Sequence, residues 1–248
     1  MTMETVWLDE RPDLVAMVDA PDLSPGPVHA YHDPVAVEFW PQLYEEFPEY
    51  QTGLLDGGQL VAKACSVPLW WGRPDAELPD EGWDWALRQG FTDQKAGRAP
   101  SALCALWIVV SSERRGTGLS PVMVASLRDT AARHGLPILY APVAPSRNAD
   151  YPLIDMQDYA RWTLADGQAP FDPWLRVHWR LGGTILHACR RSMVVSGTVG
   201  DWEEWSGLAM PGSGRYVVPR ALAPVKVDLD RDLGVYTEPN IWVRHDIS

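Results

Sequence analysis

An uninterrupted apolar run spans Ala102–Val110, and such continuous hydrophobicity over a short stretch favours a strand that is covered on both faces. Further along, Met123, Leu127 and Ala131 recur at the i, i+4, i+8 spacing of one helix face. A short polar, glycine-containing segment separates the two patterns. Residues 101–135 are therefore predicted to form a strand, a turn and a helix in immediate succession.

The residues around this helix predict its limits. Ser120 is expected to be the N-cap, with Pro121 at the first helical position. Gly135 is expected to end the helix, and Pro137 prevents it from continuing. The next apolar run, Ile138–Val143, is predicted to be the following strand.

The rest of the chain contains shorter apolar strand patterns and helical patterns. Asp56-Gly57-Gly58 is a strong hairpin turn signal. Residues before about Pro34 are rich in Pro, Asp and Gly and are expected to be mainly loop. Further helices are predicted at 35–47, 80–89, 151–162 and 172–183. Further strands are predicted at 5–8, 50–55, 59–68, 185–195 and 235–244, with a Pro- and Gly-punctuated elaboration that includes 202–208, 215–218 and 225–229. Because no repeat, low-complexity tract or linker interrupts the pattern, residues 1–248 are expected to form one elaborated domain of the α/β (α+β) class.

Composition narrows the classes of partner. The formal net charge is −12 over 248 residues, which argues against a nucleic-acid partner or an anionic membrane surface, since both attract cationic proteins. Cys65, Cys104 and Cys189 are too scattered for a disulfide framework or a CxxC pair. No apolar run approaches the roughly 20 residues that span a bilayer. We therefore expect a cytoplasmic protein, with its oligomeric state left open and a homodimer as one alternative.

Two other features raise questions of chemistry. His29 and His32 have a spacing that would suit metal ligands on a helix, but Pro27 and Pro34 make that helix improbable, so no metal is expected. The 13 Trp residues are unusual for this length. Large aromatic side chains usually belong to the core or to the wall of a cleft.

The segment Arg115-Gly116-Thr117-Gly118-Leu119-Ser120 has the properties of an anion site. Its two glycines permit a tight turn in which main-chain N–H groups approach a ligand, and a helix N-terminus follows directly. Together with Arg114, this segment resembles the R/Q-x-x-G-x-G/A signature of the GCN5-related N-acetyltransferase (GNAT) superfamily, from which Ser120 departs. The resemblance implies that residues 114–120 cradle the pyrophosphate of coenzyme A.

The same resemblance implies a fold and a co-substrate. A GNAT fold has a mixed central sheet, flanked by helices, in which two parallel strands splay apart to admit the thioester; here it would carry N- and C-terminal elaborations. Main-chain groups of Ile108, Val109 and Val110 would bind the pantetheine arm. The co-substrate would be acetyl-CoA or another acyl-CoA, and the partner a small-molecule substrate.

A second stretch suggests the catalytic groups. Aligning Leu181-Gly182 with the GNAT pattern F-Y-E-x-L-G-F places His178 where the family often has a tyrosine general acid, and a histidine titrates near neutrality. A structural role for His178 stays open. Glu113 is a candidate base, although its position between a strand and two arginines favours a solvated surface residue.

Three functions remain open at this point. The leading one is transfer of an acyl group from acyl-CoA to a small-molecule amine. The second comes from a narrower resemblance of Asp172–His178 to the D-P-x-L-R-F-H motif of GNAT-like decarboxylase and S-acyltransferase domains of polyketide loading modules, which implies a malonyl-CoA substrate, a catalytic His178 and an assisting hydroxyl such as Ser146. The third is a non-catalytic acyl-CoA-binding module.

Overall fold

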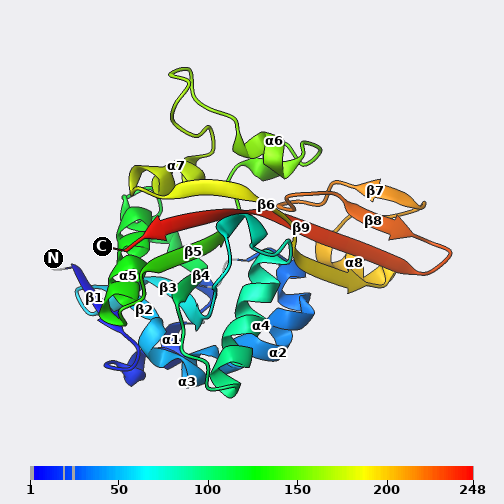
Figure 1. Cartoon of the computed structure of the whole chain (residues 1–248). Helices are drawn as coiled ribbons and strands as arrows, with labels where there is room; N and C mark the ends of the chain where they lie inside the picture. The colour runs from blue at the N-terminus through cyan, green and yellow to red at the C-terminus, as the bar shows by residue number, and fades with distance from the viewer. Residues whose placement is uncertain (1–2, 19, 24–25, 248) are drawn as a thin grey trace.

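Nine strands form one mixed sheet in the computed structural model, which describes residues 3–18, 20–23 and 26–247 (Figure 1). Their order is β1-β2-β3-β4-β5-β9-β8-β7, and β6 also pairs with β9. Within the described chain, β4 and β5 are the one parallel pair. The strands are β1 (Met3–Trp7), β2 (Thr52–Asp56), β3 (Gln59–Leu69), β4 (Ala102–Val110), β5 (Ile138–Val143), β6 (Thr184–Gly197), β7 (Gly214–Tyr216), β8 (Val225–Asp228) and β9 (Leu233–Asp246).

Helices flank this sheet, as the GNAT resemblance implied. α5 packs against β2, β3, β4 and β5, and its predicted stripe of Met123, Leu127 and Ala131 is buried. α4 packs against β3, β4, β6 and β9, and α2 packs against α4 (Figure 1). The α-helices are α1 (Val15–Val18), α2 (Pro34–Phe39), α3 (Leu43–Glu46), α4 (Gly82–Lys95), α5 (Leu119–Arg133), α6 (Met156–Ala160), α7 (Pro173–Arg180) and α8 (Val199–Ser206).

The long strand β9 joins the central sheet to the C-terminal elaboration. Its residues 241–246 pair with β5, and its residues 233–235 pair with β8. β6 runs along its other edge through most of its length. The β7–β8 extension therefore projects to one side of the sheet (Figure 1), where Trp202 and Tyr236 belong to a separate small core.

Prolines and glycines explain where the helices differ from prediction. The helix predicted at 35–47 is interrupted, because Pro41 lacks a main-chain N–H; α2 ends at Phe39 and a short 3₁₀ segment leads into α3. The helix predicted at 80–89 extends instead to Lys95. Gly90 lies inside it, where an added Cβ would come 2.0 Å from Val67 Cγ2, so glycine allows α4 to approach β3 closely.

Two further predicted segments change in extent. Of the helix predicted at 151–162, only α6 is helical, because Asp155 caps it and accepts a hydrogen bond from the Gln157 N–H at 2.8 Å. Of the stretch 202–208, residues 202–206 belong to α8, which begins earlier with a capping box formed by Thr198 and Asp201 and has Gly207 as its C-cap.

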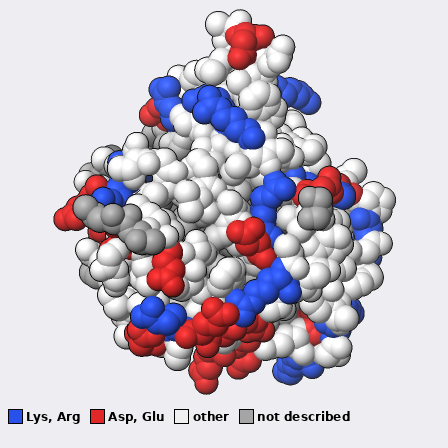
Figure 2. Space-filling view, turned by 90° about the vertical axis from the view of Figure 1, so that its left-hand side faces the viewer, with Lys and Arg blue, Asp and Glu red and all other residues white. Residues whose placement is uncertain are grey.

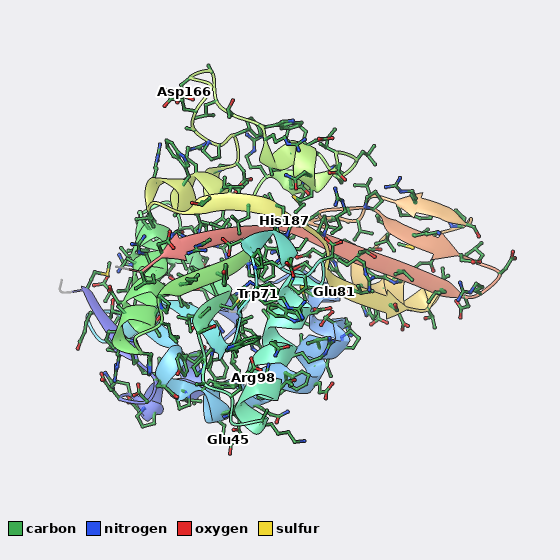
Figure 3. The ribbon with its side chains drawn as sticks, viewed as in Figure 1. Glu45, Trp71, Glu81, Arg98, Asp166 and His187 are labelled. Atoms are coloured by element: carbon green, nitrogen blue, oxygen red, sulfur yellow. The ribbon has the colours of Figure 1, made fainter. Side chains whose placement is uncertain are left out.

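The surface carries both signs of charge. On the face that carries α5 and both termini, basic and acidic side chains lie beside one another, and acidic side chains gather at its lower margin (Figure 2). Asp166 marks the tip of a loop between α6 and α7 that extends away from the sheet (Figure 3). No helix of the described chain has the length and hydrophobicity that crossing a membrane requires.

Candidate active site between two diverging strands

The site begins where β4 and β5 separate. The two strands pair only at Leu103 with Leu139 and at Cys104 with Tyr140. Immediately beyond this point β4 has a bulge relative to β3, and its Leu106 carbonyl accepts a hydrogen bond from the Trp83 indole at 2.8 Å. A bulge bends a strand and redirects its side chains. The remainder of β4 therefore diverges from β5 and leaves a gap in the sheet.

The glycine turn lies at the end of β4 and leads into α5. Gly116 and Gly118 have φ values of 76° and 84°, which favour glycine, and an added Cβ at either position meets no atom within 4 Å. Their amide groups donate to no group within the described chain. The turn thus offers open space and free N–H donors beside a helix N-terminus, and these features fit a phosphate group.

The start of α5 differs by two residues from the prediction. Gly118, in the left-handed conformation, is the N-cap, so the helix begins at Leu119 and Ser120 is its second residue. The positive φ of Gly118 redirects the chain before the serine is reached. At the other end, Gly135 follows the helix with φ 66°, in accord with the prediction.

The largest cavity at this site, here called the outer cavity, has a volume of about 510 Å³. It is lined by six of the residues predicted from sequence: Ile108, Val109, Val110, Arg115, Ser120 and Ser146. Arg114 lies elsewhere, because its guanidinium pairs with the buried Asp56 carboxylate. Thr117 bonds through its hydroxyl to the Arg114 carbonyl, and Leu119 is buried. A cofactor role for all of these residues remains a prediction.

A second space, the central cavity, occupies the gap between the diverging strands. It has a volume of about 230 Å³ and is lined by β4 residues 105–108, β5-side residues 141–144, and Trp83, Trp174, His178, Met193, Glu238 and Asn240. The outer and central cavities share Trp107, Ile108 and Trp174. A third, aromatic cavity of about 150 Å³ shares Trp83, Trp107 and Met193 with the central one. The three spaces therefore adjoin one another around Trp107.

His178 lines the central cavity from α7. Only 2% of the residue is exposed, and its Nδ1 lies 2.9 Å from Nε2 of His245 on β9. Its own Nε2 has no hydrogen-bond partner within the described chain. Because a single proton occupies the contact between the two rings, His178 Nε2 carries a proton when His245 donates and a lone pair when His245 accepts.

The expected titration of His178 near neutrality is wrong. Burial, with a smaller effect of the neighbouring His245, lowers the pKa of His178 to about 3. Burial also lowers the pKa of His245 to about 4. Both rings are neutral at physiological pH, so His178 can donate or accept a hydrogen bond but is not a standing imidazolium acid.

Ser146 is tied to the start of the same helix through Asp172. Asp172 is the N-cap of α7, at the predicted start of this helix, since its side chain accepts from the Trp174 and Leu175 N–H groups. It also accepts from the Arg147 N–H at 2.8 Å and the Tyr159 hydroxyl at 2.9 Å, while the Ser146 hydroxyl lies 3.5 Å from each of its oxygens. Asp172 thus fixes the loop after β5 against α7, and the exposed Ser146 lies at the edge of the outer cavity.

Other residues singled out in the sequence lie outside these cavities. Glu113 is exposed, in accord with a surface residue. His29 packs against Trp202 and Tyr236, and His32 stacks on Trp205. Within residues 3–18, 20–23 and 26–247, no three His, Cys, Asp or Glu side chains gather as a metal-binding group.

Comparison with known proteins bears on the family. The sequence matches no family model. It is 32% identical over 267 residues to the curated arginine N-acetyltransferase avaD of Aspergillus versicolor, covering 96% of this chain and 91% of that one. The chain belongs to the GNAT superfamily. In type it is an acyl-CoA-dependent N-acyltransferase, as the sequence predicted.

Solved structures agree with this GNAT fold. The loading GNATL domain of CurA from Lyngbya majuscula superposes with a TM-score of 0.57 at 14% identity, covering 100% of this chain and 98% of that one. The GphF GNAT-like decarboxylase, solved in complex with isobutyryl-CoA, gives a TM-score of 0.50 at 15% identity with full coverage of both chains. The predicted fold class, a mixed sheet with splayed parallel strands and flanking helices, is confirmed.

Sequence reasoning missed Trp107, Trp174, Glu238 and Asn240 as cavity residues. Trp107 was within the predicted strand, and the unusual tryptophan content was the one signal that could have marked it and Trp174. Glu238 and Asn240 carried no motif. Their place in the site depends on the pairing of β9 with β5 and β6.

Proposed function

We propose that this GNAT protein transfers the acetyl group of acetyl-CoA to a nitrogen of a small-molecule amine. The observation that carries the proposal is the continuity of the outer and central cavities through Trp107, Ile108 and Trp174, at the point where β4 leaves β5. Such an arrangement suits a long thioester substrate that enters from one side and an amine that meets its reactive end inside the sheet.

Each part of the site has a role in this proposal. The turn at Gly116 and Gly118, with Arg115, receives the pyrophosphate, and the main chain of Ile108, Val109 and Val110 receives the pantetheine arm. An N–H group of Val109 or Val110 polarises the thioester carbonyl. The amine nitrogen attacks that carbon and loses a proton, the carbon–sulfur bond breaks, and the coenzyme A thiolate takes up a proton.

His178 is proposed to act on these proton movements as a neutral imidazole. Its Nε2 lies at the central cavity without a partner in the described chain, so it is available to the departing sulfur or to the tetrahedral oxygen. His245 is a positioning residue, since its contact with Nδ1 decides whether Nε2 donates or accepts. Ser146 is proposed to assist from the edge of the outer cavity.

The choice of first acceptor rests on the curated relative, which is named for arginine. We propose arginine and its derivatives as the acceptors to test first, and the cytoplasm as the place of action, since the three cysteines are free and buried.

Decarboxylation is the second candidate, because His178, the last residue of the Asp172–His178 motif, lines the central cavity and Ser146 lines the adjoining outer cavity. In that reaction malonyl-CoA would lose carbon dioxide, and the resulting enolate would be protonated to acetyl-CoA. Mass spectrometry of acetyl-CoA and malonyl-CoA after incubation, each with and without arginine, separates the two functions. The proposed function predicts acetylarginine and free coenzyme A in equal amounts from acetyl-CoA. Conversion of malonyl-CoA to acetyl-CoA without any acetylated amine would favour decarboxylation instead.

A further inference from the structure

Three buried acidic side chains from different elements interact electrostatically near the central cavity. Glu238 comes from β9 and lines the cavity, Asp33 caps α2, and Asp84 lies in the first turn of α4. Their exposed fractions are 9%, 0% and 7%. Burial is the largest cause that raises the pKa of Asp84 and of Glu238, and the nearby Asp33 raises both pKa values further.

Arg88 interacts electrostatically with Asp84, but no cationic side chain among the described residues lines the central cavity beside Glu238. None of the described residues that line the central cavity is a lysine or an arginine, and His178 is neutral. The Glu238 carboxylate accepts a hydrogen bond at 3.0 Å from the Tyr236 hydroxyl, which carries no charge. Burial, followed by the nearby Asp33, raises the pKa of Glu238 to about 7, against an ordinary value of 4.5. A bound cation would relieve this unfavourable burial of negative charge.

A second observation points to a ligand in the same place. Asn240, two residues beyond Glu238 and therefore on the same face of β9, also lines the central cavity and is 2% exposed. Its amide nitrogen donates to the Pro142 carbonyl at 3.1 Å, which orients the side chain. Its Oδ1 has no hydrogen-bond partner within the described chain. Because the buried Asn240 Oδ1 and the Glu238 carboxylate both accept hydrogen bonds, this part of the cavity favours a ligand with several N–H donors.

The walls of the cavity suit a flat cation. Trp83, Trp107 and Trp174 contribute aromatic side chains to its lining. A guanidinium group stacks on such rings, and its fork of N–H donors can reach a carboxylate and an amide oxygen together.

Resting on the proposed function, we infer that the central cavity selects a cationic acceptor with a guanidinium group, which pairs with the Glu238 carboxylate and donates to Asn240 Oδ1. Glu238 is then the specificity-determining residue of this chain. The tryptophan rings stack against the plane of the guanidinium group, and the Tyr236 hydroxyl orients the Glu238 carboxylate.

Calorimetric binding of arginine and of citrulline to the coenzyme A complex tests this inference without turnover. Citrulline has nearly the same shape but replaces the guanidinium with a neutral urea group. The wild type should bind arginine about thirtyfold or more tightly than citrulline, and Glu238→Gln should remove that preference, because the buried charge pair is lost. Glu203→Gln is the matched control, since Glu203 lies on the distant α8, where it accepts from the Met210 N–H.

A folded Glu238→Gln protein that keeps the preference would overturn the inference, as would a wild type that binds the two ligands equally. If Glu238→Gln does not fold, Glu238→Asp keeps the charge but withdraws it by one methylene, and an unchanged preference in that variant would likewise count against the inference. Acetyl transfer to arginine with unaltered turnover in Glu238→Gln would reject the cation site and leave the proposed function standing. Absence of acetylated product from every amine tried would reject the proposed function itself, whatever the binding data show.

Discussion

In the proposed function, His178 acts through the placement of a neutral ring, since burial keeps its pKa far below physiological pH. We predict that His178→Gln, which retains much of the volume and a hydrogen-bonding group, lowers turnover by about a hundredfold or more while coenzyme A affinity changes little. Steady-state kinetics measures turnover, isothermal titration measures coenzyme A affinity, and thermal melting reports stability. His187→Gln is the control, because His187 contacts the Leu78 carbonyl, away from these cavities.

Near-normal turnover in folded His178→Gln would remove His178 from the chemistry. A large drop in melting temperature with proportionate loss of coenzyme A binding would assign it a structural role instead.

Residues near the glycine turn could be placed from sequence because their signals are local. Arg115 and Ser120 are within a few positions of the turn, and Ile108 to Val110 immediately precede it. Glu238 could not be placed in this way, since more than a hundred positions separate it from the turn and only the sheet order brings them together. The neutral state of His178 also escaped sequence reasoning, because a pKa depends on burial.

At the scale of elements, the turn before α5 provides the most direct test of the phosphate site. We predict that Gly118→Val weakens coenzyme A binding by more than about tenfold, because valine opposes the φ of 84° and adds bulk beside the N–H groups. Gly97→Val is a matched control: Gly97 also has positive φ and open space around its Cβ position, but it follows α4. Isothermal titration with coenzyme A compares the two variants, and equal weakening in both would contradict the assignment.

Helix boundaries agreed with the prediction where one local sequence signal determined them, and they differed where packing against other elements determined them. Asp172 with Pro173 began α7 as predicted. The helix predicted at 80–89 was expected to end before Gly90, yet α4 continues through it, and the missing side chain of Gly90 lets the helix lie close to Val67. The pairing of β6, β8 and β9 required long-range contacts that no local pattern encodes.

At the scale of the whole molecule, buried acids predict how stability responds to pH. Glu238 has a folded pKa of about 7 and an ordinary value of 4.5, so its protonated form favours the folded state below about pH 4.5 and this contribution is lost as pH rises through 7. This contribution to the free energy of unfolding is on the order of 3 kcal/mol. The free energy of unfolding of Glu238→Gln minus that of the wild type should therefore be larger at pH 8 than at pH 5.

Urea unfolding of both proteins at the two pH values measures this difference, with Glu203→Gln as the control. An advantage of Glu238→Gln that is the same at pH 5 and pH 8 would contradict the account of Glu238.

We also propose that residues 1–248 unfold in one transition, since strands from Met3 to Asp246 share one sheet.

The arrangement of acyl-CoA in the gap between β4 and β5 is the central claim, and a crystal structure of the complex with coenzyme A tests it most directly. The pyrophosphate should lie against the amide groups of Gly116 and Gly118 at the start of α5, with the pantetheine arm along Ile108–Val110. The sulfur should point into the central cavity, toward His178. A well-defined coenzyme A whose phosphates lie away from this turn, or whose sulfur lies outside the cavity, would contradict the account.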